Sequence, residues 1–309
     1  MKLKFREITS GLRFPEGPIV MPDGSVLVVE IEGARLIRVL PDGAKQVVAE
    51  LGGGPNGAAV GPDGKCYVCN NGGFNWIHAD DGFARPHGRA DAYTGGSIQR
   101  VDLETGVVET LYTHCGDTPI MGPNDIVFDG KGGFWFTDHG KSYDRLMDRG
   151  ALFYAAADGS FIQEAAFPLI TPNGVALAPD GDTLYVSETE TGRVWSFPIL
   201  GPGELGKEPW PSPHGGTFIG GPTGYQRFDS MAVEANGNIC VATLVNAGIS
   251  VFAPDGGLVE FHEAPEPYST NIAFGGPDMK TAYITLSGYG QLVAVDWPRP
   301  GLPLIHQMA

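Results

Sequence analysis

Short apolar runs recur along the whole chain, and each follows a turn signal rich in Gly, Pro, Asn or Asp. Runs such as VLVVE, CYVCN and ICVAT contain the β-branched and aromatic residues that strands prefer. The Asp-Gly and Asn-Gly pairs between runs suit tight hairpins, because these residues tolerate a positive φ. The pattern therefore predicts many short antiparallel strands joined by hairpin turns.

Six segments of the chain share one repeating unit. Each begins with a carboxylate or amide residue, continues through an apolar run, and reaches a turn signal seven positions later. A second strand-like run follows, and further runs complete a unit of about 40 residues or more, which is the length of a propeller blade. The polar residues that begin the six units are Glu16, Asn56, Asn124, Asn173, Asp229 and Asn271.

This repeat predicts an all-β fold, a single six-bladed β-propeller domain over residues 1–309 with four antiparallel strands per blade. One unit cannot bury both of its faces, so the units must stack around an axis. The sixth unit runs short of chain after Trp297, and we expect the segment KFREITS near the N-terminus to supply its outer strand and close the ring. A pair of β-sandwiches or a β-helix would not explain six repeats of this length.

Composition and charge exclude several classes of fold and of binding partner. The 46 Gly and 25 Pro among 309 residues argue against a helical bundle, whereas 42% hydrophobic residues can build a large core. A formal net charge of −16 provides no basic footprint for nucleic acid or an anionic membrane, although it suits a cation site. Neither a membrane-length apolar segment nor a signal-peptide pattern is present, so we expect a cytoplasmic protein without nucleic-acid or membrane partners. The oligomeric state stays open.

The cysteines include a CxxC pair, Cys66 and Cys69, inside a strand-like run. Residues three apart on a strand point to opposite faces, so a zinc or redox site would need a turn that the segment does not signal. We expect these cysteines, with Cys115 and Cys240, to be small core residues in a reducing compartment.

The strand order places the six polar residues that begin the units around the axis at one end, and the Asp-Gly turns at the other. The ring then contains two carboxylates and four amides, with no His or Cys. Hard oxygen donors select Ca²⁺, Mg²⁺ or Mn²⁺ over zinc or copper. The alternative is that each residue only caps its own turn. That alternative does not explain Glu16, because Glu is a poor turn former.

Long connections fall at the same end as the polar ring. One runs from Asn71 to about Gly95 and another from His139 to Gly150. Long loops on one end of a rigid scaffold commonly determine function, so we expect the first of them to shape a substrate entrance. The roles of three loop histidines stay open, with a solvated side chain as the simpler interpretation: His78, His87 and His139.

Several motifs, taken in order, resemble the SMP-30/gluconolactonase/luciferin-regenerating-enzyme family of six-bladed propellers, in particular its bacterial lactonases. The resemblance covers essentially the whole chain. It implies one divalent metal, most often Ca²⁺, with Mg²⁺, Mn²⁺ or Zn²⁺ as alternatives, and ligands at Glu16, Asn173 and Asp229 with Asn124 nearby. The motifs are FPEGP (14–18), PNDIVFD (123–129), GGFWFTD (132–138), TPNGV (171–175), LYVSE (184–188) and FDSM (228–231).

The resemblance also implies an activity, the metal-dependent hydrolysis of the ester bond of a small lactone, with Asp229 as the usual general base. Asp138, at the end of its strand, is the alternative base. Family members that act on sugar lactones often carry Arg where this chain has Gly122, and many carry Gly where it has Ser230. These departures leave the lactone undefined. The candidate substrate-binding residues face the same end: Asn56, Asn124, Asn271, Tyr225 and Arg227.

Two other functions are compatible with the sequence. The same scaffold could support a different metal-assisted reaction, since a fold does not determine a function. It could also be a non-enzymatic binding platform with a structural cation. A platform should spread its aromatic residues over a rim, whereas Phe74, Trp76, Tyr143 and Tyr225 all fall on loops at the polar end, which favours an enzyme.

Overall fold

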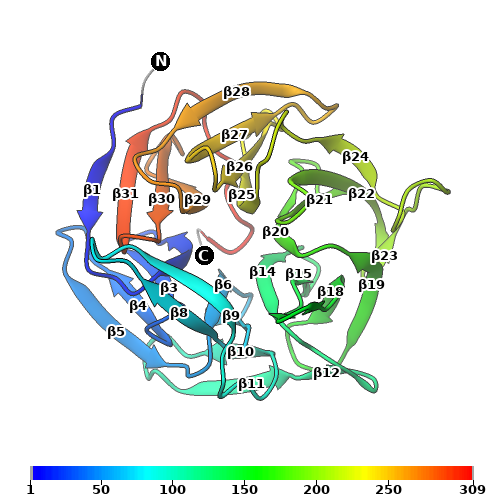
Figure 1. Cartoon of the computed structure of the whole chain (residues 1–309), viewed down its shortest axis with the longest axis horizontal. Coiled ribbons are helices and arrows are strands. Elements are labelled where there is room, and N and C mark those ends of the chain that lie inside the picture. Colours follow the sequence, from blue (N-terminus) through cyan, green and yellow to red (C-terminus); the bar gives the residue numbers. More distant parts are fainter. Residues whose placement is uncertain (1–2, 308–309) are drawn as a thin grey trace.

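The computed structural model describes residues 3–307, which form a ring of six antiparallel sheets around a central axis (Figure 1). The predicted six-bladed propeller is confirmed. Within the described residues there is no helix, and so none that could cross a membrane. Three short two-stranded hairpins project from the ring.

The first three blades follow the repeat, each from its inner strand outward. Blade 1 contains β2 (Pro15–Val20), β3 (Val26–Glu30), β4 (Arg35–Val39) and β5 (Lys45–Glu50). Blade 2 contains β6 (Pro55–Val60), β7 (Cys66–Asn70), β10 (Ser97–Val101) and β11 (Val108–Tyr112). Blade 3 contains β14 (Pro123–Phe128), β15 (Gly133–Asp138), β18 (Gly150–Ala156) and β19 (Ile162–Leu169).

The remaining blades keep this order with two variations. Blade 4 contains β20 (Pro172–Leu177), β21 (Thr183–Glu188), β22 (Arg193–Gly201) and β24 (Thr217–Gly220), with β23 (Glu204–Leu205) paired to the end of β22. Blade 5 contains β25 (Phe228–Val233), β26 (Ile239–Thr243), β27 (Gly248–Phe252) and β28 (Leu258–Glu263). Blade 6 contains β29 (Ser269–Gly275), β30 (Thr281–Leu286), β31 (Gln291–Asp296) and β1 (Arg6–Thr9). The three hairpins are β8 (Phe74–His78) with β9 (Ala84–Arg89), β12 (His114–Cys115) with β13 (Thr118–Pro119), and β16 (Ser142–Tyr143) with β17 (Leu146–Met147).

The ring closes through the N-terminal strand, as expected. Strand β1 pairs antiparallel with β31, with Arg6 opposite Ala294 and Glu7 opposite Val293. In Figure 1, β1 runs along the outside of β31. Blade 6 therefore combines strands from both ends of the described chain.

The core lies between neighbouring blades, because alternate side chains of each middle strand point to opposite faces. On β15, Phe134 and Phe136 pack toward blade 2, whereas Trp135 packs toward blade 4. The CxxC pair behaves in the same way: Cys66 and Cys69 lie in different core clusters on opposite faces of β7. Burial raises the pKa of the Cys66 thiol to about 12. The prediction that Cys66 and Cys69 are buried in the core is confirmed.

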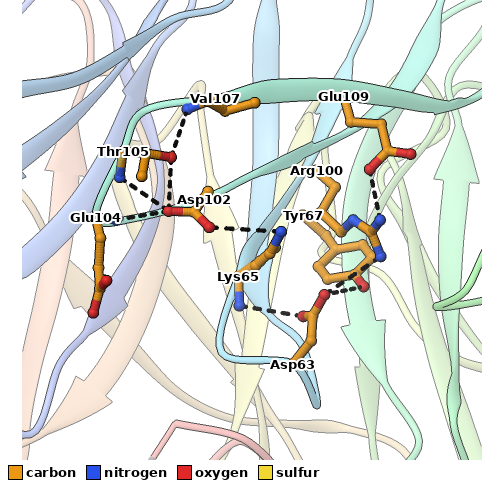
Figure 2. A network of polar contacts seen from close by, with 9 residues as sticks. All are labelled: Asp63, Lys65, Tyr67, Arg100, Asp102, Glu104, Thr105, Val107 and Glu109. Carbon is orange, nitrogen blue, oxygen red and sulfur yellow. Dashed lines mark hydrogen bonds and ion pairs between the residues drawn. The ribbon is translucent and has the colours of Figure 1, made fainter.

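The turns at the end away from the polar ring are fixed by their own aspartates, as blade 2 shows (Figure 2). Asp63 accepts the backbone N–H of Lys65 at 3.2 Å and the hydroxyl of Tyr67 at 3.2 Å. Asp102 accepts the backbone N–H of Thr105 at 2.9 Å. These Asx-type contacts explain why the sequence places Asp in the turns.

Candidate functional site

Six polar side chains surround the propeller axis because the inner strands share one backbone irregularity. In each inner strand the pairing with the second strand shifts register beside the polar residue. Such bulges re-aim a side chain. A Cβ added at Gly17, Gly57 or Gly174 would lie 2.4 to 2.8 Å from the nearest backbone atom of the next inner strand. The Gly that follows the polar residue thus lets neighbouring blades approach closely at the axis.

A cavity of about 240 Å³ opens at this end and is called the funnel cavity below. Five of the six polar residues line it, together with Arg227 from the connection that precedes β25. Apolar side chains, including Phe14, Phe74 and Tyr268, complete the lining. The five residues of the ring are Glu16, Asn56, Asn124, Asn173 and Asp229.

The sixth residue of the ring, Asn271, does not line the funnel cavity. Its side-chain N–H donates to Glu16 Oε2 at 2.7 Å, so it orients a carboxylate instead of facing a substrate. Tyr225 also lies outside the lining, with 67% of its surface exposed. Both residues were substrate-binding candidates in the sequence, and their placement gives neither a direct contact with the cavity.

The floor of the funnel cavity concentrates buried carboxyl groups. Burial raises the pKa of Glu16, and burial followed by the charge of Glu16 raises the pKa of Asp229 well above its usual range. Asp125, which the sequence did not single out, is a third buried acid near the axis. It lines the cavity at the opposite end and not the funnel cavity, and burial and the charge of Glu16 raise its pKa to about 7. Acids grouped in this way are stable only when protons or a cation balance their charge.

Two oxygen atoms at the axis lack any donor within residues 3–307: Glu16 Oε1 and Asn124 Oδ1. Asn173 donates its side-chain N–H to Thr189 Oγ1 at 3.0 Å, which leaves its own oxygen directed elsewhere. Asn173 Oδ1 accepts the hydroxyl of Ser230 at 3.4 Å, so the donor-free oxygens are those of Glu16 and Asn124, on two different blades. Buried oxygens without donors are what an oxygen-ligated cation requires. The donor set Glu16, Asn124, Asn173 and Asp229 therefore fits a divalent cation. Two of these four ligands are amides. Within the described chain, no group of three or more His, Cys, Asp or Glu side chains is arranged to hold a metal, so the candidate site depends on its amide oxygens.

Asp138 has a different environment from Asp229. Its two carboxylate oxygens accept backbone N–H groups from Met121 at 2.7 Å, Gly122 at 2.6 Å and Gly140 at 2.9 Å, and it does not line the funnel cavity. The last residue of the second strand has the same role in three other blades. Its side-chain oxygen accepts an N–H from the loop that enters the blade: Glu30 from Arg13, Asn70 from Gly54, and Glu188 from Ile170.

Gly122, where the family often has Arg, lines the funnel cavity against a neighbouring backbone. A Cβ at this position would lie 2.5 Å from the carbonyl oxygen of Gly140. The loop that follows β15 thus occupies the space that a side chain would need. This departure from the family pattern is built into the local backbone.

The long loop after β7 folds into the hairpin β8–β9, called the entrance hairpin below, which passes in front of blade 1 in the view of Figure 1. Its tip reaches blade 6, where the backbone N–H of Ala84 donates to Gly288 O at 2.8 Å and Tyr289 donates its hydroxyl to Asp81 at 2.9 Å. Phe74 and Pro86 of the hairpin line the cavity. The location expected for this loop agrees with the structure, and its effect on substrate choice stays a prediction.

Lys141 is a residue that the sequence did not single out. It lies in the loop after β15, lines the funnel cavity and is only 2% exposed. Its ammonium group donates to Asn71 Oδ1 at 2.9 Å and Gly73 O at 3.0 Å, at the base of the entrance hairpin. A lysine in a polar loop normally points to solvent, so no sequence signal identified it. His139 lines the same cavity, whereas His87 is exposed and His78 pairs with Glu32 at 3.0 Å.

Comparison with known proteins identifies the family. The model of the SMP-30/gluconolactonase/LRE-like region matches residues 14–288. The chain belongs to this family. The matched residues include all six inner strands and all residues that line the funnel cavity.

Relatives within this family are named as hydrolases. The chain is 31% identical to the diisopropyl-fluorophosphatase of Loligo vulgaris over 196 residues, which are 59% of each chain. It is 28% identical to the lactonase drp35 of Staphylococcus saprophyticus over 78% of this chain and 67% of that protein. It is 27% identical to the gluconolactonase of Zymomonas mobilis over 87% of this chain and 75% of that protein. The match to the squid enzyme spans less than two thirds of its length.

The fold is shared with solved structures. A regucalcin from Agrobacterium tumefaciens, described as a calcium-binding protein, superposes with a TM-score of 0.73 at 20% identity, over 98% of this chain and 99% of that one. At this identity the likeness concerns the fold alone. The superposition covers nearly the whole of both chains.

Proposed function

We propose that this protein is a divalent-metal-dependent lactonase that hydrolyses the ester bond of a small lactone. The observation behind the proposal is the pair of donor-free buried oxygens, Glu16 Oε1 and Asn124 Oδ1, beside Asp229 on the floor of the funnel cavity. The names of the lactonase relatives supply the reaction class, and the calcium-binding neighbour makes Ca²⁺ the first choice of metal.

In this proposal the metal is held by Glu16, Asn124, Asn173 and Asp229. When bound, a divalent cation supplies Lewis-acid chemistry that polarises an ester carbonyl and stabilises negative charge on its oxygen. The side chain of Asn271 holds Glu16 in position through their 2.7 Å hydrogen bond.

Asp229 is the proposed general base. One of its oxygens accepts the backbone N–H of Ser230 at 3.1 Å, and the other can accept a proton from the attacking water. Both oxygens of Asp138 are already hydrogen-bonded to backbone amides, which supports Asp229 for this role. Asn56 and Arg227 can bind polar groups of the substrate, and the aromatic lining restricts water.

A different metal-assisted hydrolysis at the same site is the second candidate. The relative named diisopropyl-fluorophosphatase suggests a phosphorus ester or fluoride as the alternative substrate class. The same donor set and the same base would serve either substrate. The two candidates differ only in the reacting group that the funnel cavity accepts.

One assay tests both candidates. The purified protein is offered a panel of γ- and δ-lactones and diisopropyl fluorophosphate, before and after treatment with EDTA, and then with added Ca²⁺. We expect lactone hydrolysis that disappears with EDTA and returns with Ca²⁺. Full activity in protein shown by elemental analysis to be metal-free would contradict metal dependence. Turnover of the phosphorus compound alone would favour the second candidate.

A further inference from the structure

Unpaired polar atoms gather in the funnel cavity. Within residues 3–307, eight buried side-chain nitrogen and oxygen atoms have no hydrogen-bond partner, and four of them belong to residues that line this one cavity. Buried polar groups are normally hydrogen-bonded, so each exception needs an explanation. Two of the four are the oxygens of Glu16 and Asn124 on the floor. The other two are donors, Asn71 Nδ2 and Arg227 Nε, and the proposed metal does not explain them.

The orientation of the Asn71 amide is fixed by its neighbours. Its Oδ1 accepts both the ammonium group of Lys141 at 2.9 Å and the backbone N–H of Gly73 at 2.8 Å. Because both neighbours are donors, this atom must be the oxygen and the unpaired atom must be the NH₂ group. Asn71 is buried, so its free N–H groups are held in place without a protein acceptor.

Lys141 contributes a positive charge that has no direct counter-ion. Its ammonium group has three hydrogens, and its two acceptors are both uncharged oxygens. The nearby carboxylates are engaged elsewhere: Asp148 accepts the hydroxyl of Tyr143 at 2.6 Å, and Asp138 accepts backbone amides. In the described part of the chain no carboxylate oxygen lies within 4.0 Å of the Lys141 nitrogen.

Charged groups around Lys141 come from several elements. Burial lowers the pKa of Lys141 to about 7, and the positive charge of Arg89 on β9 lowers it further. The negative charges of Asp138 on β15 and of Asp148 act in the opposite direction and raise the pKa. His139 experiences the same positive region, since burial, followed by the charges of Lys141 and Arg227, lowers the pKa of its ring to about 4. Two cationic side chains, Lys141 and Arg227, therefore line the funnel cavity, although the whole chain has a formal net charge of −16.

Arg227 supplies the second charge. Its terminal nitrogen pairs with Glu190, and its Nε remains buried without a partner. The funnel cavity is thus lined by the guanidinium of Arg227, which pairs with Glu190 in the same lining, by the ammonium group of Lys141 and by the free amide N–H of Asn71. Donor sets of this kind recognise carboxylate and phosphate oxygens.

We propose that Asn71, Lys141 and Arg227, called the donor wall, form a subsite for an anionic oxygen group, so that the substrate is a lactone bearing a carboxylate or a phosphate. The inference rests on the proposed lactonase function and adds the class of lactone. A cavity of about 240 Å³ is smaller than the roughly 300–1,000 Å³ of sites for drug-sized ligands, which agrees with a small substrate. With its anionic group on the donor wall and its ester toward Asp229, such a substrate would be held in one orientation.

The test compares three lactones of one ring size that differ in a single substituent: carboxylate, phosphate monoester or hydroxymethyl. The kcat/KM of each is measured for the Ca²⁺-loaded wild-type protein. We expect one or both anionic lactones to exceed the hydroxymethyl lactone by roughly tenfold to hundredfold, the range of a charge-assisted hydrogen bond. The two anionic arms distinguish a carboxylate from a phosphate as the natural group. Equal kcat/KM for all three lactones would overturn the inference and leave the lactonase function intact.

Variants then locate the preference. The quantity compared is the kcat/KM of the anionic lactone divided by that of the hydroxymethyl lactone. In Lys141→Met this ratio should fall at least tenfold, and in Arg227→Gln it should also fall. Lys65→Met is the matched control. Lys65 does not line the funnel cavity, and its ammonium group lies 3.6 Å from a carboxylate oxygen of Asp102. The ratio for this variant should stay at the wild-type value. Thermal melts report folding. If Lys141→Met fails to fold, the Arg227→Gln ratio decides. An undiminished ratio in both folded variants would overturn the assignment.

The subsite can also be tested without turnover. If no lactone is hydrolysed, the proposed function fails, and calorimetric binding of the same three lactones decides the inference. Tighter binding of an anionic lactone to wild type, reduced in Lys141→Met, would support the donor wall. Equal binding of all three would overturn it. For wild type, the KM of an anionic lactone should rise between pH 6 and pH 8, because Lys141 loses its charge as the pH passes its lowered pKa of about 7.

Discussion

The two ends of the propeller axis differ in chemistry more than in size. At the end opposite the funnel cavity lies a larger cavity of about 410 Å³, here called the far cavity. It is lined by apolar residues of the inner strands, by the C-terminal segment around Leu302 and Ile305, and by charged residues that include Asp129, Lys131 and Asp180. In the described chain, none of its lining residues has a buried polar side-chain atom without a partner. The funnel cavity is smaller but has four such atoms. Unmet hydrogen-bonding capacity, and not volume, distinguishes the end that we propose to be active.

The largest expected effect is the loss of turnover in Asp229→Asn. A general base contributes on the order of 10² to 10⁴ in rate, and we expect kcat to fall by at least that factor at saturating Ca²⁺. High Ca²⁺ separates the loss of the base from weaker metal binding. The measurement is kcat over a Ca²⁺ titration, with thermal melts as the folding control.

Asp138→Asn is the matched variant for Asp229→Asn. It exchanges one acceptor oxygen for an NH₂ group facing backbone N–H donors, so its main effect should be a lower free energy of unfolding, by about 1–3 kcal/mol. Its kcat should fall less than that of Asp229→Asn. A near-wild-type kcat in Asp229→Asn, combined with an inactive but folded Asp138→Asn, would assign the base to Asp138 instead.

The next effect is on metal affinity. Replacing Glu16 with Gln removes one of two charged ligands, and calcium affinity depends on ligand charge, so Kd should rise on the order of tenfold or more. Asp180→Asn, in the lining of the far cavity, is the control and should bind metal as wild type does. Calorimetric titration and elemental analysis measure both. Equal metal content and affinity in Glu16→Gln and wild type would remove Glu16 from the ligand set.

A smaller effect is expected from shortening the entrance hairpin. Replacing residues 76–87 with a short turn removes the contact with blade 6, so relative kcat/KM values across a lactone panel should change several-fold while the metal stays bound. Shortening the β12–β13 hairpin, whose residues do not line the funnel cavity, is the control. If both variants keep the wild-type selectivity, the hairpin does not shape the entrance.

The smallest effect on activity should come from the far cavity. Gln307 donates its side-chain N–H to Val20 O at 3.2 Å and to Phe274 O at 2.8 Å, which fastens the C-terminal segment over the inner strands. Gln307→Ala should lower the unfolding free energy by about 1–3 kcal/mol and leave kcat unchanged. Thermal melts and lactone assays measure the two effects. A tenfold fall in kcat would show that the two ends of the axis are coupled.

The fold and the polar ring could be predicted because both follow from a local pattern that is repeated six times. A turn signal seven positions after Glu16 or Asn56 fixes the hairpin, and the hairpin fixes which end of the blade the polar residue occupies. Blade closure by β1 followed from counting strands. These features depend on neighbours in sequence, which a single chain displays.

The rest of the site depends on contacts between blades, which the repeat does not encode. Lys141 is buried only because the entrance hairpin from blade 2 meets the loop of blade 3. Asn271 turns to Glu16 because blades 6 and 1 adjoin. Asp125 is an acid at the position directly after the polar ring residue, where most units have a small residue. The exposed Tyr225 has the same local features as a site residue and differs only in tertiary placement.

The pairing of β1 with β31 has a consequence for how the molecule is made. The two strands lie near opposite ends of the described chain. Their pairing must therefore close a very long loop, and we expect it to form late in folding. Until β31 has been synthesised, β1 has no partner and blade 6 is absent from the ring, which leaves exposed strand edges and unpacked apolar faces. A nascent chain on the ribosome therefore passes through a period in which five blades can exist but the circle is open. During that period we expect chaperone binding and sensitivity to protease, and both should end together when the last strand docks.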